Sequence, residues 1–262
     1  MNRMGRIAML AAGAGLVGGL FALERLRPLR RPTAPGLGRT AHNVAMGLAC
    51  LAVIEAVEKP LTGRIAAANQ SRSRGLAGLL PRPLRPLAVL ALMDYTFYLW
   101  HVLTHKVPVL WRFHRVHHAD PDLDMSTAIR FHFADMIVSL PWRLAQVRLS
   151  GADPRGLGLW RGFFNASVLF HHANLRLPRG WDRRLSRLLT TPEMHGIHHS
   201  RSPYERDSNW SSGLSIWDHL HGTWRGDPQQ DRLAIGVMSG TPEEAASLPV
   251  SLAAPFAGRN GQ

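Results

Sequence analysis

The chain has 262 residues, of which 45% are hydrophobic, so it is long enough for one large domain and too apolar to be disordered by composition. Its net charge of +13 suits an anionic membrane surface or a nucleic acid, or it reflects a codon bias toward Arg, since Lys59 and Lys106 are the only lysines. Nucleic-acid binding is disfavoured, because the arginines follow no periodic face and no zinc-finger or RNP-like motif occurs. The single cysteine, Cys50, excludes an intramolecular disulfide and a Cys₄ iron–sulfur cluster.

The first predicted element is a membrane helix over Ile7–Leu23, a run without any charged residue. This run is about as long as the shortest helices that span a bilayer. Because Arg3 and Arg6 precede it, a signal peptide is the alternative, but no A-x-A cleavage site follows, which favours an uncleaved anchor. A basic cluster after the run predicts that the next segment is cytoplasmic; it comprises Arg25, Arg27, Arg30 and Arg31.

Later apolar runs are shorter or interrupted by polar residues, so the number of spanning helices stays open. The stretch Gly63–Pro86 is rich in Arg, Gly, Ser and Pro and is predicted to be a loop. The segment after Arg225 is predicted to be mostly loop. The apolar runs are Asn43–Ile54, Leu87–Leu103, Met136–Trp142 and Gly162–Phe170.

Histidines carry the chemical signal. Eleven of the 14 lie between His101 and His199, including one H-x₃-H pair that starts at His101 and two H-x₂-H-H clusters that start at His114 and His195. Residues three or four apart share a helix face, so each cluster is predicted to aim two or three imidazoles at one point. Neutral imidazole binds iron, zinc, copper and nickel. Eight such ligands exceed the need of one ion and predict two ions, each with an open position.

Three kinds of metalloprotein are compatible with this pattern. One is an oxygenase, which is implied by the family resemblance described below. The near absence of carboxylates in the clusters argues against ferritin-like metal pairs, and the absence of H-E-x-x-H argues against ordinary metalloproteases. A zinc-dependent membrane hydrolase that cleaves a lipid ester or phosphate is the alternative, although such sites usually keep a carboxylate base. Metal storage or transport would favour ligands within several membrane spans. It is disfavoured here, because the clusters adjoin the polar segments 119–124 and 200–209, which suggests a site outside the bilayer core.

The order of the blocks between Asp94 and Arg225 resembles the fatty acid hydroxylase superfamily, also called the sterol desaturase family. The blocks are DYTFYLWHVLTH, LWRFHRVHH, RFHFAD, FHHANLRLP, TPEMHGIHHS, DSNW and LSIWDHLHGTWR. The resemblance implies an all-α protein in which integral membrane helices carry a cytoplasmic helical cap with a histidine-rich di-metal site. It also implies two iron ions, with zinc possible after isolation, and O₂ as co-substrate for hydroxylation or desaturation of a fatty acyl chain, a sterol or a related lipid.

The sequence also predicts a partner and a location. No dinucleotide-binding fingerprint follows a plausible strand, so a separate protein is expected to donate any electrons that the enzyme needs. The protein would lie in a bacterial inner membrane with the metal site facing the cytoplasm. The chain then divides into an N-terminal membrane part over residues 1–93, a catalytic region over 94–225 and a C-terminal tail over 226–262.

Carried over to this chain, the motif histidines become catalytic metal ligands. His172 is added as a ninth metal ligand, and Asp94 and Asn174 are expected to orient imidazoles. The eight motif histidines are His101, His105, His114, His117, His118, His195, His198 and His199.

Some positions depart from the family pattern. Phe133 and Asp135 stand where Pro and Glu are usual, and the roles of His132, His171 and Asp135 stay open. His219 and His221 replace the more usual Arg and Phe and are expected at the surface; His42 is expected to have no catalytic role. Candidate channel residues, for each of which ordinary packing is the alternative, are Phe97, Tyr98, Trp100, Trp111 and Phe113.

Overall fold

The computed structural model describes residues 3–34, 36–226, 229–238 and 245–257. Within these residues the chain is helical and contains no strand, only two isolated β-bridges, which confirms the predicted all-α class. The helices of three or more turns are α1 (Arg3–Leu26), α2 (Leu37–Val53), α3 (Lys59–Arg72), α4 (Arg85–Lys106), α5 (Pro108–His118), α7 (Leu140–Ser150) and α8 (Pro154–His172). Shorter elements are η1 (Ile54–Glu58), η2 (Leu76–Leu79), η3 (Arg82–Leu84), η4 (Thr127–Ile129), α6 (Phe133–Val138), α9 (Trp181–Leu185), α10 (Pro192–His198), α11 (Pro203–Arg206), α12 (Ile216–His221), η5 (Gln230–Arg232), α14 (Leu248–Ala253) and η6 (Ala254–Phe256).

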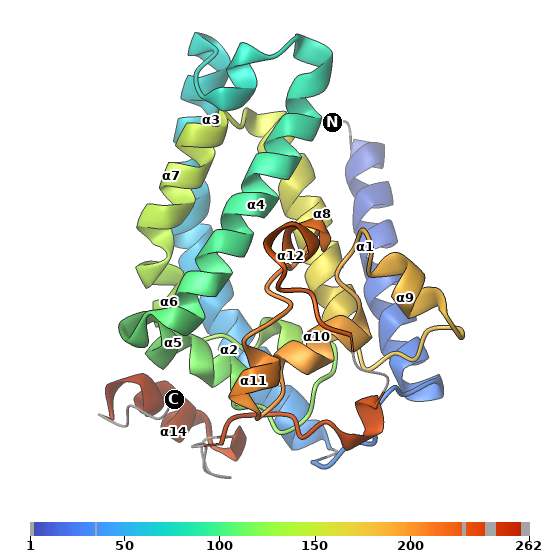
Figure 1. The fold of residues 1–262 in the computed structure, drawn as a ribbon. Coiled ribbons are helices and arrows are strands. Elements are labelled where there is room, and N and C mark those ends of the chain that lie inside the picture. Colours follow the sequence, from blue (N-terminus) through green and yellow to red (C-terminus); the bar gives the residue numbers. More distant parts are fainter. Residues whose placement is uncertain (1–2, 35, 227–228, 239–244, 258–262) are drawn as a thin grey trace.

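The long helices run roughly along one direction, and the short segments α10, α11 and α14 gather near one end of them (Figure 1). Helix α4 packs against α8, α5 and α7, so it lies at the centre of the bundle. The main apolar core forms among α3, α4, α7 and α8, around Ala66, Met93, Val147 and Leu157. This core supports the half of α4 that precedes its histidines.

The predicted loop over Gly63–Pro86 is wrong for its first half. Helix α2 continues through the π-helical turn η1 into α3, so one nearly continuous helix runs from Leu37 to Arg72. The physical reason is burial: Ala66 and Asn69 pack inside the bundle, and the Asn69 side-chain amide donates to the carbonyl oxygens of Val147 and Ala152. Tertiary contacts therefore outweigh the local loop composition.

Helix α1 contains the predicted run Ile7–Leu23 and confirms it as a helix. Its end is attached to the rest of the protein, because Leu20 is buried against Ala173 and the Glu24 carboxylate accepts hydrogen bonds from the backbone N–H groups of Met125 and Asn174. Its role as a membrane anchor stays a prediction. Among the described helices, the segment Arg82–Lys106 is long and apolar enough to cross a membrane, and 39% of its apolar window is buried inside the protein.

Candidate metal centre

The histidines of the motifs converge from four helices. Helix α4 carries His101 and His105 near its end, the last turns of α5 carry the first H-x₂-H-H cluster, α8 ends at His172, and α10 with the residue after it carries the second cluster. All nine predicted ligands are buried, at 0–7% exposure. Imidazoles far apart in the sequence thus share one dry interior.

The nine imidazoles separate into two groups, within each of which the available nitrogens lie within 4.8 Å of one another. The two groups touch, because the rings of His118 and His199 stack at 4.2 Å between centroids. The first histidine group comprises His101, His105, His114, His118 and His198. The second histidine group comprises His117, His172, His195 and His199.

Each cluster aims two imidazoles at one point, as expected, but the remaining histidine of each H-x₂-H-H cluster reaches the other group. In the first cluster, His114 and His118 belong to the first group, whereas His117 belongs to the second group. In the second cluster, His195 and His199 belong to the second group, whereas His198 belongs to the first group. Sequence neighbours diverge by about 100° around a helix, because 3.6 residues complete a turn, and adjacent histidines therefore reach different points.

Hydrogen bonds to backbone carbonyls orient four of the imidazoles. The Nδ1 atom of His101 lies 2.6 Å from the carbonyl oxygen of Trp210, and that of His198 lies 2.9 Å from the carbonyl oxygen of Ser208. A carbonyl can only accept, so each Nδ1 carries the proton and each Nε2 keeps its lone pair for a metal. The same bonds are made in the second group by His117 to Arg130, at 3.1 Å, and by His172 to Val168, at 2.8 Å.

With these tautomers, unprotonated Nε2 atoms meet in the second histidine group. The Nε2 atoms of His117 and His172 lie 3.1 Å apart, and both are unprotonated, so two lone pairs face each other. His195 continues the contact, with its Nε2 atom 3.1 Å from that of His172 and 3.0 Å from that of His199. Such spacing is expected for imidazoles on one ion, since metal–nitrogen bonds of about 2.0–2.1 Å place neighbouring ligands about 3 Å apart.

Protonation does not relieve this crowding. Burial lowers the pKa of His199 well below 6.5, and it lowers the pKa of His198 to about 3, so both rings are neutral near pH 7. In the first group, both ring nitrogens of His105 and of His118 have no hydrogen-bond partner among the described residues. An unpaired buried polar group costs about 1–3 kcal/mol, and a bound cation would remove that cost. The donor set therefore fits metal ions.

The loop that carries the carbonyls of Ser208 and Trp210 is held by a buried carboxylate. Asp218 of α12 accepts hydrogen bonds from the backbone N–H groups of Trp210, at 2.8 Å, and Ser211, at 2.9 Å, and from the hydroxyl of Thr223, at 2.6 Å. Asp218 is a functional residue that was not predicted, because nothing in the motif around it indicates a contact with the backbone of Trp210 and Ser211.

The expected role of Asp94 and Asn174 in orienting imidazoles is wrong. Asp94 accepts from the backbone N–H of Leu214 and from the indole of Trp217, both at 2.8 Å, so it ties α4 to the segment at α12. The side chain of Asn174 pairs with the backbone N–H and carbonyl of Arg30, again at 2.8 Å, and holds the chain that follows α1. Backbone carbonyls take the place of side chains as imidazole partners.

Three residues whose roles the sequence does not predict lie in different environments; they are His132, His171 and Asp135. The Asp135 carboxylate lies 3.7 Å from Nδ1 of His114, so the shorter acid does approach a predicted ligand. His171 lies outside both groups but its ring is 4.1 Å from that of His195. The Nε2 atom of His132 donates a hydrogen bond to the backbone carbonyl of Leu252 in the C-terminal segment.

The three remaining histidines lie outside both groups. His219 stacks on Trp224, and His221 stacks on Tyr98 and is exposed. His42 is buried next to the positive charge of Arg130, and burial lowers its pKa. The expected surface positions of His219 and His221 are confirmed, because both residues are exposed. That none of the three histidines binds metal stays a prediction.

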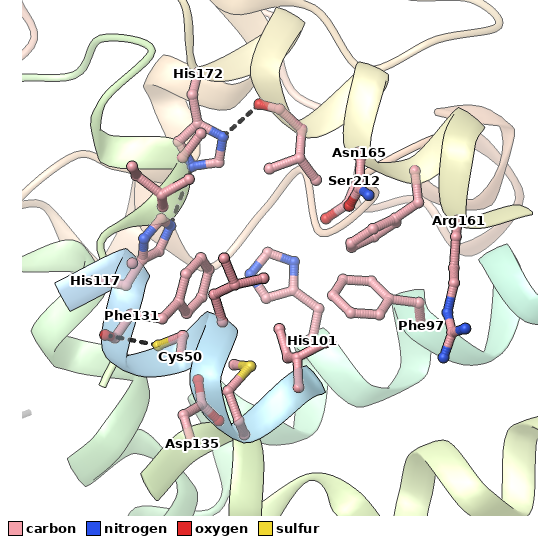
Figure 2. Close-up of a pocket in the computed structure, with 18 of the residues that line it drawn as sticks. Cys50, Phe97, His101, His117, Phe131, Asp135, Arg161, Asn165, His172 and Ser212 are labelled. Atoms are coloured by element: carbon pink, nitrogen blue, oxygen red, sulfur yellow. Dashed lines mark hydrogen bonds between the residues drawn. The ribbon is translucent and has the colours of Figure 1, made fainter. Parts of the chain in front are cut away.

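A cavity of about 460 Å³ adjoins the histidines, between α2 on one side and α8 on the other (Figure 2). This volume lies in the range of about 300–1,000 Å³ that is usual for ligand pockets. Its walls are mainly apolar, and its metal-proximal end includes His101, His117 and His172. Two polar side chains, Asn165 and Ser212, also line it.

Two of the five predicted channel residues line this cavity, namely Phe97 and Trp100. The prediction is wrong for the other three, which do not line it. Tyr98 is hydrogen-bonded at 3.1 Å to Thr223, and Trp111 packs against the ring of His105. Phe113 packs against Phe256 of the C-terminal segment. Aromatic character beside a motif did not reveal which way each ring points.

Comparisons with known proteins agree with the motif pattern. The sequence model of the family described as fatty acid hydroxylase matches residues 86–223. The chain is 33% identical over 168 residues to ornithine lipid hydroxylase OlsE of Rhizobium tropici, a match that covers 64% of this chain and 49% of that protein. No solved structure matches.

Two animal enzymes are also similar. Alkylglycerol monooxygenase of Xenopus tropicalis is 29% identical over 145 residues, which cover 55% of this chain and 31% of the relative. Cholesterol 25-hydroxylase of Rattus norvegicus is 29% identical over 162 residues, which cover 57% of this chain and 50% of the relative. The chain thus matches about half or less of the length of these relatives.

Proposed function

The chain belongs to the fatty acid hydroxylase family, and on that premise we propose that it hydroxylates a lipid with O₂ at two iron ions held by nine histidines. The observation that carries the proposal is the division of the nine buried imidazoles into two groups that meet at His118 and His199. Five and four nitrogen donors leave room at each ion for O₂. Zinc would replace iron in protein isolated after overproduction.

When bound, the iron pair would supply activation of O₂ and oxidation of an alkyl C–H bond. The chain's own contribution is the orientation of the ligands through the carbonyls of Trp210, Ser208, Arg130 and Val168, which fix the tautomers and ring planes. The cavity contributes an apolar environment that excludes water from the reacting carbon.

The wall of the cavity offers a route by which the alkyl chain of a lipid would reach the histidines. Leu48 and Leu51 of α2 line the cavity and are also exposed, so apolar surface continues from the exterior into the cavity. Such a surface suits entry of an alkyl chain from a bilayer. We expect the protein to reside in a bacterial inner membrane with the metal centre on the cytoplasmic side, and a separate protein to deliver the electrons.

Hydroxylation is favoured over desaturation, because the relatives named above are hydroxylases and a monooxygenase. A zinc-dependent hydrolase finds no support among them. Asp135, the carboxylate that approaches a ligand, lies beside His114 and is a candidate for orienting that ring rather than for activating water.

Comparison of the lipids of cells with and without the gene tests the proposal. We expect one lipid class to gain one oxygen atom only in cells that contain the protein. Cells in which the His198→Ala variant replaces the parent protein should lack this oxygenated lipid. Products of ester or phosphate cleavage would instead support the hydrolase, and an unchanged lipid profile with the protein expressed and metal-loaded would contradict the proposal.

A further inference from the structure

The end of the cavity away from the histidines is charged. Glu58, Arg143 and Arg161 line it, and these three residues are called the charged end below. Figure 2 shows Arg161 on the opposite side of the cavity from His117 and His172. Arg161 and His172 lie on the same helix, and eleven residues of helix separate them by about 16 Å.

The charged end is assembled from three elements. Glu58 closes the π-helical turn η1, Arg143 comes from α7 and Arg161 from α8. The Glu58 carboxylate is 6% exposed and accepts hydrogen bonds from Arg143, at 3.1 Å, and from Arg161, at 3.3 Å. Arg161 also donates to the hydroxyl of Thr62 at 2.7 Å. π-helical turns occur frequently at functional sites, and one places Glu58 here.

The balance of charge favours an anion. Two guanidinium groups face a single carboxylate, so the charged end keeps one formal positive charge, while the nearby Lys59 is paired with Glu55. Arg161 lines the cavity and donates through Nη2 alone in the described hydrogen bonds, so its Nε and Nη1 groups are not used by them. Guanidinium groups bind carboxylate and phosphate oxygens through paired hydrogen bonds.

We propose that the charged end binds the anionic group, a carboxylate or a phosphate, of a single-chain amphiphile whose alkyl chain extends through the apolar cavity toward the histidines. The inference rests on the proposed function only in taking the histidine end as the place of oxidation. A purely structural clamp between α3, α7 and α8 is the rival explanation. A clamp does not require excess positive charge, and apolar side chains would serve it without the cost of burying ions.

Ligand binding tests the inference without turnover. The full-length protein in a non-ionic detergent is titrated with palmitate, with 1-palmitoyl lysophosphatidate and with hexadecanol, which has the same chain length as palmitate but no charge. We expect at least one of the two anionic ligands to bind about tenfold more tightly than hexadecanol, and we expect inorganic phosphate not to displace it. Displacement by inorganic phosphate would show a free-anion site and overturn the proposal.

Three variants separate charge recognition from folding. Arg161→Gln should remove the preference for the anionic ligand and leave hexadecanol binding unchanged, which also shows that the cavity is intact. Glu58→Gln keeps both guanidinium groups and should preserve or strengthen the preference. Arg155→Gln, on the same helix but exposed, is the matched control and should behave as the parent.

The outcomes are decisive for this proposal and separable from those for oxidation. Arg161→Gln that binds the anionic ligand like the parent, or that loses both ligands equally, would refute recognition by the charged end. Failure of the parent to prefer either anionic ligand would refute it as well. Charge-dependent binding without any oxidised product would support this inference and count against the proposed hydroxylation alone.

Discussion

At the scale of single residues, the two groups make a specific claim about sequence neighbours. His117 and His118 are adjacent in the sequence, yet His117 belongs to the second histidine group and His118 belongs to the first histidine group. Loss of one imidazole should therefore disturb one ion more than the other. We predict that His117→Ala and His198→Ala each lower the metal content from about two ions per chain to about one, and lower product formation by at least about 10–100-fold.

His219→Ala and His221→Ala are the controls for this experiment. The Nε2 atom of His219 donates a hydrogen bond to the backbone carbonyl of Ser186, and its ring stacks on Trp224, while His221 contacts Tyr95 and Tyr98. Both variants should keep metal and most activity. Metal analysis and product assays at matched expression check the set. Full metal occupancy in His198→Ala, or its loss in His219→Ala, would mean that other histidines hold the ions.

At the scale of elements, Asp218 of α12 holds the loop between α11 and α12, whose carbonyls orient two of the histidines. Asp218→Ala leaves the N–H groups of Trp210 and Ser211 without their acceptor, so the carbonyl that orients His101 should shift. We predict a loss of metal affinity of about 10–100-fold, measured by competition with a chelator. Asp207→Asn, which breaks the ion pairs with Lys106 and Arg206, should cost about 0–1 kcal/mol of stability and leave metal binding unchanged. Equal effects of both changes would contradict a special role for Asp218.

Helix α1 has two parts with different roles. Its first part is apolar, whereas Leu20 and Glu24 attach its end to the segment that follows α8. We predict that deletion of residues 1–18 weakens attachment to membranes under carbonate washing but leaves metal content unchanged, because Leu20 and Glu24 remain. The fraction of protein in the membrane pellet measures this attachment. Loss of metal in this truncation would show that the whole helix supports the centre.

At the scale of the whole molecule, metal and fold are coupled. Nine buried imidazoles lie around the centre, and several of their nitrogens have no other partner among the described residues. Ions that bind only the folded state stabilise it. We predict about two transition-metal ions per purified chain, iron in the active form, and a lower midpoint of thermal unfolding after chelation. Restored stability on adding iron, but not magnesium, is the control; a folded protein without transition metal would contradict the centre.

The sequence by itself determined the ligand candidates and the class of fold. The spacing within H-x₃-H and the two H-x₂-H-H clusters identified histidines on shared helix faces, and the family resemblance added His172. All nine are brought together in the structure. Local spacing suffices here because a helix fixes the relative directions of side chains three and four residues apart.

Only the tertiary structure decided how these histidines are shared, what orients them and where a substrate lies. The division of each cluster between two groups depends on how the ends of α4, α5, α8 and α10 converge. The orienting partners are backbone carbonyls, such as that of Trp210, which every residue type possesses and which therefore leave no trace in the sequence. Glu58, Arg143 and Arg161 are far apart along the chain, and no local pattern brings them together. Their meeting follows from helix packing, because long-range contacts are set by the fit of whole surfaces and not by the residues adjacent in sequence.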